Sequence, residues 1–174
     1  IHLTTTPTIL GSFLRKYAAL SGMDESLLRR TFVFHPATIG APTRLHGAEL
    51  RFFYTLHSIP AVGVEVFYRG KSLVISGDTL YDPPKIRELC EAGVISEGRR
   101  DALLGFPFHH AVVLHEAGVP PLHTPAKVLS ELPDEVKERL YVVHIAQKDI
   151  PHGVGLKAAP IGLQGTIRIE VSSP

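Results

Sequence analysis

The chain has 174 residues, of which 44% are hydrophobic and 20% are charged, and 18 Lys and Arg against 17 Asp and Glu leave a net charge of +1. These values are typical of one globular domain, exclude a disordered or fibrous chain, and give no basic footprint for nucleic acid. The single cysteine, Cys90, excludes an internal disulfide and fits a reducing, cytoplasmic compartment, and no apolar run reaches the length of a membrane span.

The first half of the chain is predicted to alternate short strands and helices. We expect a strand at 1–5, a helix from Thr8 to Leu20, a short helix at 24–29 and a strand at 31–35. The segment PATIGAPTRLHG is rich in Pro and Gly, so it is expected to consist of turns. A strand at 49–57 follows, and then a hairpin whose strands VGVEVFY and SLVIS are joined by Arg69-Gly70-Lys71.

From Pro83 onwards, helical segments alternate with apolar strands. PPKIRELCEAG places Ile86, Leu89 and Cys90 on one helical face, and a further helix is expected around 97–104. HAVVLHEAG and LYVVHIA are predicted as buried strands, TPAKVLSELP as a helix capped by Thr124, and GTIRIEV as a last edge strand. This order predicts a sheet covered by helices, that is, an α/β or layered α+β domain.

Polar residues follow the apolar strands in a repeated pattern. Asp78 follows SLVIS, His115 and Glu116 follow AVVL, and His144 follows LYVV, while His57 ends ELRFFYTL in the same way. Ligands bind beyond the carboxyl ends of strands in sheets of this kind. Imidazoles and carboxylates that meet at one edge of a sheet are the ligands of a zinc or two-metal site.

Each of these residues also has a simpler interpretation. Asp78 in SGDT could bond backbone amides in a turn, Glu116 could make a local pair, and Cys90 fits the core face of a helix better than a nucleophile. Five other histidines are expected on the surface or in loops, namely His35, His46, His109, His110 and His152. The metal hypothesis therefore depends on the set of residues and not on any one of them.

The order of the motifs resembles the second half of the metallo-β-lactamase family. H-x-x-x-x-x-G from His57, a short hairpin, SGDT, H-E-A, H-T and a strand ending in a histidine are most similar to the branch that contains ribonuclease Z and related phosphodiesterases. The resemblance runs from about residue 49 to 171. It implies that His57, Asp78 and His144 bind metal, with Asp78 bridging two ions. It also implies that His123 protonates the leaving group and that Glu116 is its acidic neighbour.

The resemblance implies an incomplete αββα sandwich in which 1–174 form one partial domain. Residues 1–48 would be the rear of the first half and 49–174 the second half. The family motif HxHxDH is absent from these residues and is expected before Ile1, so the chain alone is expected to be inactive and to hold metal weakly. A complete protein would bind two divalent ions, zinc first, with manganese or iron as alternatives.

The predicted function is a metal-dependent hydrolase, phosphodiesterase-like, that acts on a small ester or phosphodiester through a metal-activated water. Transfer RNA is not expected as a substrate, because a tight turn stands where ribonuclease Z carries a long insertion. A non-catalytic binding or regulatory module remains an alternative, as does a thioester or lactone hydrolase. Contact with a second chain, or with the missing N-terminal part, is expected across the exposed sheet.

Overall fold

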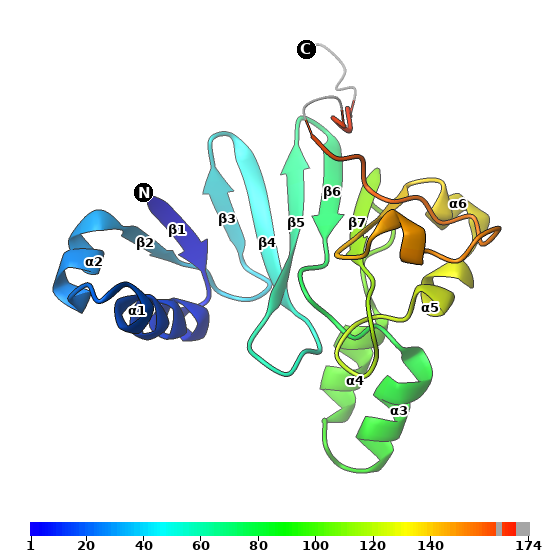
Figure 1. Ribbon diagram of the computed structural model, residues 1–174, viewed down its shortest axis with the longest axis horizontal. Coiled ribbons are helices and arrows are strands. Elements are labelled where there is room, and N and C mark those ends of the chain that lie inside the picture. Colours follow the sequence, from blue (N-terminus) through cyan, green and yellow to red (C-terminus); the bar gives the residue numbers. More distant parts are fainter. Residues whose placement is uncertain (163–164, 170–174) are drawn as a thin grey trace.

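The computed structural model describes residues 1–162 and 165–169, which form a two-stranded sheet, a six-stranded sheet and helices beside them (Figure 1). The elements are, in chain order, β1 (His2–Thr5), α1 (Pro7–Ser21), α2 (Glu25–Thr31), β2 (Val33–Pro36), β3 (Pro42–Leu45), β4 (Ala48–Tyr54), β5 (Val62–Tyr68), β6 (Lys71–Ile75), α3 (Pro83–Glu91), α4 (Glu97–Leu104), β7 (Val112–Glu116), α5 (Ala126–Ser130), α6 (Asp134–Lys137) and β8 (Leu140–Val143). The predicted α/β layering is therefore confirmed.

The small sheet is formed by β1 and β2, which pair in parallel through a crossover made of α1 and α2. Helix α1 starts with Pro7 at its first position and ends at Gly22, whose φ of 66° is the left-handed conformation that closes a helix. Asp24 begins α2 by accepting a hydrogen bond from the amide of Ser26 at 2.7 Å.

The large sheet has the strand order β3-β4-β5-β6-β7-β8, with antiparallel pairing up to β6 and parallel pairing from β6 to β8. Strand β3 was not predicted, because its segment was interpreted as turns only. The missed signal is His46-Gly47, a two-residue hairpin loop in which both residues have positive φ. Arg69-Gly70 has the same conformation, which matches the twist of the flanking strands.

One face of the large sheet carries the core. Val74, Val113 and Leu140 are neighbours across three strands and are fully buried. They pack with Leu129 of α5 and with the aromatic segment between α4 and β7. On the opposite face, Ile75 remains 37% exposed, so apolar surface is left open there.

Two other expectations are corrected by the structure. The helix expected in TPAKVLSELP is shorter than predicted, since α5 covers only Ala126–Ser130, and Thr124 does not cap it, because the residue at that position is Pro125. Residues 165–169 are not part of a strand, and residues 170–171 of the expected edge strand GTIRIEV lie outside the described residues. His110, expected on the surface or in a loop, lies in the loop before β7 and is fully buried.

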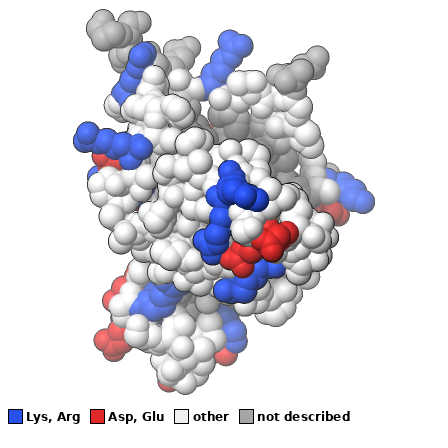
Figure 2. Space-filling model, turned by 90° about the vertical axis from the view of Figure 1, so that its left-hand side faces the viewer, with Lys and Arg blue, Asp and Glu red and all other residues white. Residues whose placement is uncertain are grey.

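The described surface gives no sign of a continuous positive band on the face seen in Figure 2, where Lys and Arg are scattered and several lie beside Asp or Glu. Arg29 with Glu25 on α2 is one such pair, at 2.7 Å. Among the described residues, no helix is both long enough and apolar enough to cross a membrane.

Candidate metal centre at the strand ends

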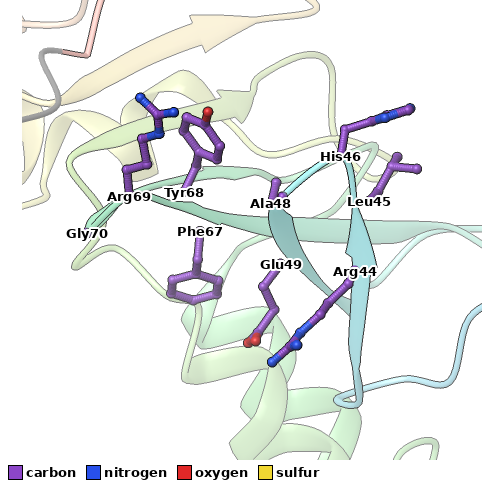
Figure 3. Close-up of a pocket in the computed structure, with 10 residues that line it drawn as sticks. Arg44, Leu45, His46, Ala48, Glu49, Phe67, Tyr68, Arg69 and Gly70 are labelled. Atoms are coloured by element: carbon purple, nitrogen blue, oxygen red, sulfur yellow. The ribbon is translucent and has the colours of Figure 1, made fainter. Parts of the chain in front are cut away.

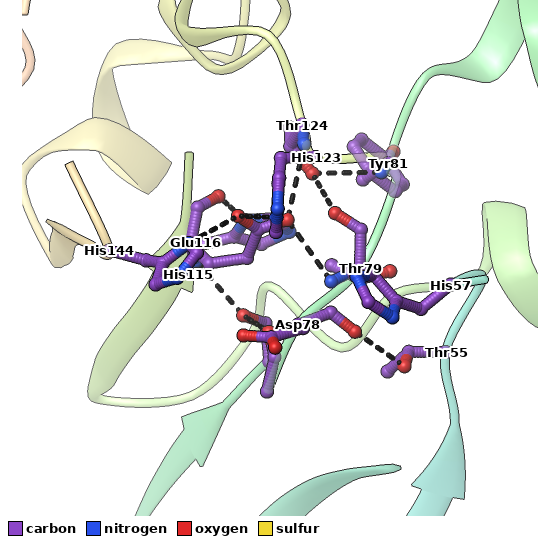
Figure 4. Close-up of polar contacts among 12 residues, drawn as sticks. Thr55, His57, Asp78, Thr79, Tyr81, His115, Glu116, His123, Thr124 and His144 are labelled. Carbon is purple, nitrogen blue, oxygen red and sulfur yellow. Dashed lines mark hydrogen bonds and ion pairs between the residues drawn. The ribbon is translucent and has the colours of Figure 1, made fainter. Parts of the chain in front are cut away.

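Five polar side chains surround one end of the large sheet, and each comes from a different segment (Figure 4). His57 follows β4, Asp78 follows β6, Glu116 is the last residue of β7 and His144 is the first residue after β8. His123 comes from the loop between β7 and α5. Five of the residues singled out in the sequence therefore lie at one rim of the large sheet.

Glu116 is the centre of the hydrogen-bond network at this rim. Its side chain is almost fully buried, and one carboxylate oxygen accepts hydrogen bonds from the amides of Thr79 at 3.0 Å and Thr124 at 3.1 Å. The other oxygen lies 3.1 Å from Nδ1 of His123 and 3.6 Å from Nδ1 of His144. Two fixed amides thus orient a carboxylate whose free edge faces two imidazoles.

The three histidine rings lie next to one another above this carboxylate. Ring centroids are 5.4 Å apart for His57 and His123, and 4.7 Å apart for His123 and His144. Glu116, His123 and His144 each offer one ligand atom, and these atoms lie within 4.8 Å of one another. His57 and Asp78 are at the same rim but are not members of this close group.

The donor set at the rim suits a divalent cation. Nε2 of His57 is buried and has no hydrogen-bond partner among the described residues, which is an unusual state for a ring nitrogen in a native protein. Asp78 is exposed and its carboxylate is available. Neutral imidazoles and carboxylates are the ligands that zinc takes in open sites, so the residues present fit such an ion.

The segments that carry His57 and Asp78 are tied to each other through Thr55. Its hydroxyl donates to the carbonyl oxygen of Asp78 at 2.8 Å, and its own carbonyl accepts a hydrogen bond from the Arg99 side chain at 3.0 Å. Burial lowers the pKa of the Arg99 guanidinium, but a guanidinium remains charged at neutral pH. A positive group from α4 therefore anchors the end of β4.

Gly77 fixes the backbone that leads to Asp78. Its φ is 61°, and a Cβ atom built on it would lie 2.3 Å from the carbonyl oxygen of Val62. Only glycine fits this left-handed position against a neighbouring strand, which explains the SGDT motif in physical terms.

His144 itself has a positive φ of 62°, which is uncommon for a residue other than glycine. Such backbone strain is concentrated at functional sites, because the surrounding structure must hold it in place. The conformation turns the chain immediately after β8 and leaves the ring half-exposed beside Glu116.

His115 does not take part in this arrangement, although the sequence pattern grouped it with Glu116. Successive residues of a strand point to opposite faces, so His115 faces the core, where its ring stacks on Phe108 and contacts Phe106. Burial lowers its pKa to about 4, although Nδ1 donates a hydrogen bond to the carbonyl of Glu116 at 2.7 Å. His115 is therefore a neutral core residue.

Three threonines that support the site were not selected from the sequence, namely Thr55, Thr79 and Thr124. Thr124 had been assigned to a helix cap, but its hydroxyl donates to the carbonyl of Thr79 at 2.9 Å and accepts from the amide of Tyr81 at 2.8 Å. A threonine directly after Asp78 and another directly after His123 were the only signals available in the sequence.

Of two grooves on the surface, one lies far from this rim and the other lies beside it. One of about 460 Å³ lies at the hairpin loops, at the end of the sheet opposite to His57. Its side chains point to both sides of the hairpins and do not converge, with Tyr68 and Arg69 on one side and Phe67 on the other (Figure 3). Another of about 720 Å³ opens between His144 and the segment 158–162, directly beside the candidate centre.

Comparison with known proteins gives three informative similarities. No family model matches the chain. The chain is 55% identical over 171 residues to cGMP-dependent 3′,5′-cGMP phosphodiesterase A of Dictyostelium discoideum, covering 98% of the chain and 20% of that protein. It is 36% identical over 171 residues to cAMP/cGMP-dependent 3′,5′-cAMP/cGMP phosphodiesterase B of the same organism, covering 98% of the chain and 16% of that protein.

A solved structure shares the fold at low sequence identity. The metallo-β-lactamase fold protein YhfI from Bacillus subtilis superposes with a TM-score of 0.54 and 8% identity, over 88% of the chain and 57% of that protein. The chain thus spans a fifth or less of the length of the two phosphodiesterases it matches, and a little over half of the structural neighbour.

Proposed function

We propose that the chain, which has the metallo-β-lactamase fold, forms mainly the second half of that fold in a metal-dependent phosphodiesterase whose substrate is a 3′,5′-cyclic nucleotide. The similarity to two cyclic-nucleotide phosphodiesterases along nearly the whole chain supports this substrate class. The observation that carries the proposal is the buried carboxylate of Glu116 between His123 and His144 at the rim of the sheet.

The metal-holding residues in this proposal are His57, Asp78 and His144. The sheet fixes the backbone of all three, and the orphaned nitrogen of His57 supports its role as a ligand. When bound, two divalent ions, with zinc preferred, would polarise a phosphoryl oxygen and lower the pKa of a water to near neutrality.

His123 then serves as the general acid. Glu116 accepts the Nδ1 proton of His123, which leaves Nε2 as the nitrogen that can hold a proton for the departing oxygen of the phosphodiester. Because both amide partners of Glu116 are backbone groups, the imidazole is oriented by a carboxylate that cannot rotate away. A positioned general acid typically contributes about 10²–10⁴-fold to the rate.

The groove beside His144 provides room for the nucleoside part of such a substrate. Its volume of about 720 Å³ lies in the range of small-molecule sites, and Ala146, Pro160 and Ile161 contribute apolar surface to it. Strands β5 and β6 are joined by the two-residue loop Arg69-Gly70 and not by a long insertion that could bind transfer RNA. This supports a small substrate.

The same proposal includes a partner for the apolar face of the large sheet that lies opposite to the core. Val64, Ile75 and Leu114 are neighbours across β5 to β7 on this face and are partly exposed, whereas Phe52 beside them on β4 is buried. In a complete αββα sandwich a second sheet packs there, supplied either by another segment of the polypeptide or by a second chain.

The test is a comparison of His123→Ala and Glu116→Gln with the unchanged full-length protein. Hydrolysis of cyclic GMP and of bis(p-nitrophenyl) phosphate is measured beside metal content by elemental analysis. We expect both variants to keep their metal and to lose most of the rate, whereas His152→Ala, an exposed control, keeps both. An unchanged rate in His123→Ala would contradict the general-acid role, and loss of metal in that variant would make His123 a ligand instead.

A further inference from the structure

A second group of ligand-type side chains lies away from the rim. It consists of Glu65 in the middle of β5 and of His109 and His110 in the segment that enters β7. His110 precedes β7, whereas Glu116 is its last residue. At about 3.3 Å per residue the two positions are roughly 20 Å apart along the strand, so this group is separate from the candidate metal centre.

The donor atoms of this group are close enough for one ion. Nε2 of His110 lies 2.9 Å from a carboxylate oxygen of Glu65, and the ring of His109 stacks on that of His110 with a centroid distance of 4.4 Å. One ligand atom from each residue lies within 4.8 Å of the other two. Donors about 2.0–2.2 Å from a tetrahedral ion are separated by about 3.3 Å, so modest rotations of the side chains are sufficient.

The state of His110 distinguishes it from an ordinary core histidine. Its side chain is fully buried, yet Nδ1 has no hydrogen-bond partner among the described residues. Burial lowers the pKa of His110, although the carboxylate of Glu65 opposes the shift. Nδ1 and Nε2 lie on opposite sides of the imidazole, so an ion shared with Glu65 would bind Nε2 and leave Nδ1 to a buried water.

The surrounding charges leave Glu65 available to a cation. Arg51 lies directly opposite Glu65 on β4, but its guanidinium pairs with Glu49 at 2.7 Å and lies over the ring of Phe67. Arg139 donates a hydrogen bond to the backbone carbonyl of His110, and its charge also lowers the pKa of the His110 ring. The positive groups nearby therefore have other partners.

The geometry points to a second divalent-cation site in this protein, formed by Glu65, His109 and His110, which takes an ion that prefers imidazole, such as zinc. Two imidazoles and one carboxylate leave a fourth position for water, and the exposed ring of His109 gives access from solvent. The ion would fasten the segment before β7 to β5, two parts of the chain that are more than 40 residues apart.

The experiment uses zinc alone as the probe, on a His144→Ala background that breaks up the group at the rim. The side-chain nitrogens of His109 and His110 are followed by ¹⁵N NMR as zinc is added, and the affinity is measured by calorimetry. We expect both rings to shift on binding of one equivalent, and His109→Gln to weaken that binding at least about tenfold. His152→Gln, another exposed histidine, serves as the matched control and should leave the affinity unchanged.

Because His109 is exposed, its substitution should not unfold the protein, and the circular dichroism spectrum verifies this. Zinc addition that leaves the nitrogens of both rings unshifted would overturn the proposal. Equal zinc affinity in His109→Gln and the background would overturn it as well. Either result would leave Glu65 and His110 as a buried structural pair, without bearing on the hydrolytic site.

Discussion

Acidification should destabilise this protein through His115. In the folded chain this ring is fully buried, its Nδ1 proton is donated to the carbonyl of Glu116, and its Nε2 is buried without a partner among the described residues. A second proton would therefore produce a buried cation among Phe106, Phe108 and Tyr81.

The magnitude follows from the difference in pKa between the two states. Burial lowers the pKa of His115 from its ordinary value of 6.5 to about 4 in the folded protein. Between these values the unfolded chain binds a proton that the folded chain does not. The free energy of unfolding therefore falls as pH decreases, by about 1.4 kcal/mol per pH unit. Over the whole window the loss is roughly 3 kcal/mol, and above pH 6.5 the contribution is constant.

The assay is urea denaturation at intervals of half a pH unit from pH 4 to 8, for the unchanged chain and for His115→Phe. Phenylalanine keeps the aromatic packing and cannot titrate, so the slope between pH 4 and 6.5 should become shallower by about 1 kcal/mol per unit. The comparison uses slopes, because the variant also loses one hydrogen bond at every pH. Equal slopes in the two proteins would refute the placement of His115 in the core.

Three further outcomes are expected. Asp78→Ala should remove most of the metal and all hydrolysis from the full-length protein, while metal retained at full stoichiometry by elemental analysis would contradict a bridging role. Gly77→Ala should lower the free energy of unfolding by more than about 2 kcal/mol. The control Gly93→Ala, which has a similar positive φ but nothing within 4 Å of the new Cβ, should cost about 1–2 kcal/mol. In light scattering the 174-residue chain should exceed its monomer mass of 19.0 kDa, because its open sheet face favours association, and a monodisperse monomer would contradict this.

The sequence by itself determined the local elements and the positions of the polar residues relative to them. Alternating apolar residues predict β5 and β6, and Arg69-Gly70 predicts their hairpin, because backbone preferences of this kind act over a few residues. The placement of His57, Asp78 and His144 within three residues after strands is likewise a property of the chain alone. Strand ends meet at one edge of a sheet whatever side chains they carry. The sequence alone therefore predicts that these three residues share an edge.

Only the tertiary structure decided which of these side chains meet. Glu116 and His115 are adjacent in sequence and equally polar, yet strand alternation sends one to the rim and the other into the core. The pairing of Glu65 with His110 joins segments 45 residues apart, and no local pattern encodes it. Contacts of this kind depend on strand register and on the packing of helices against one face, which are settled only when the whole sheet forms.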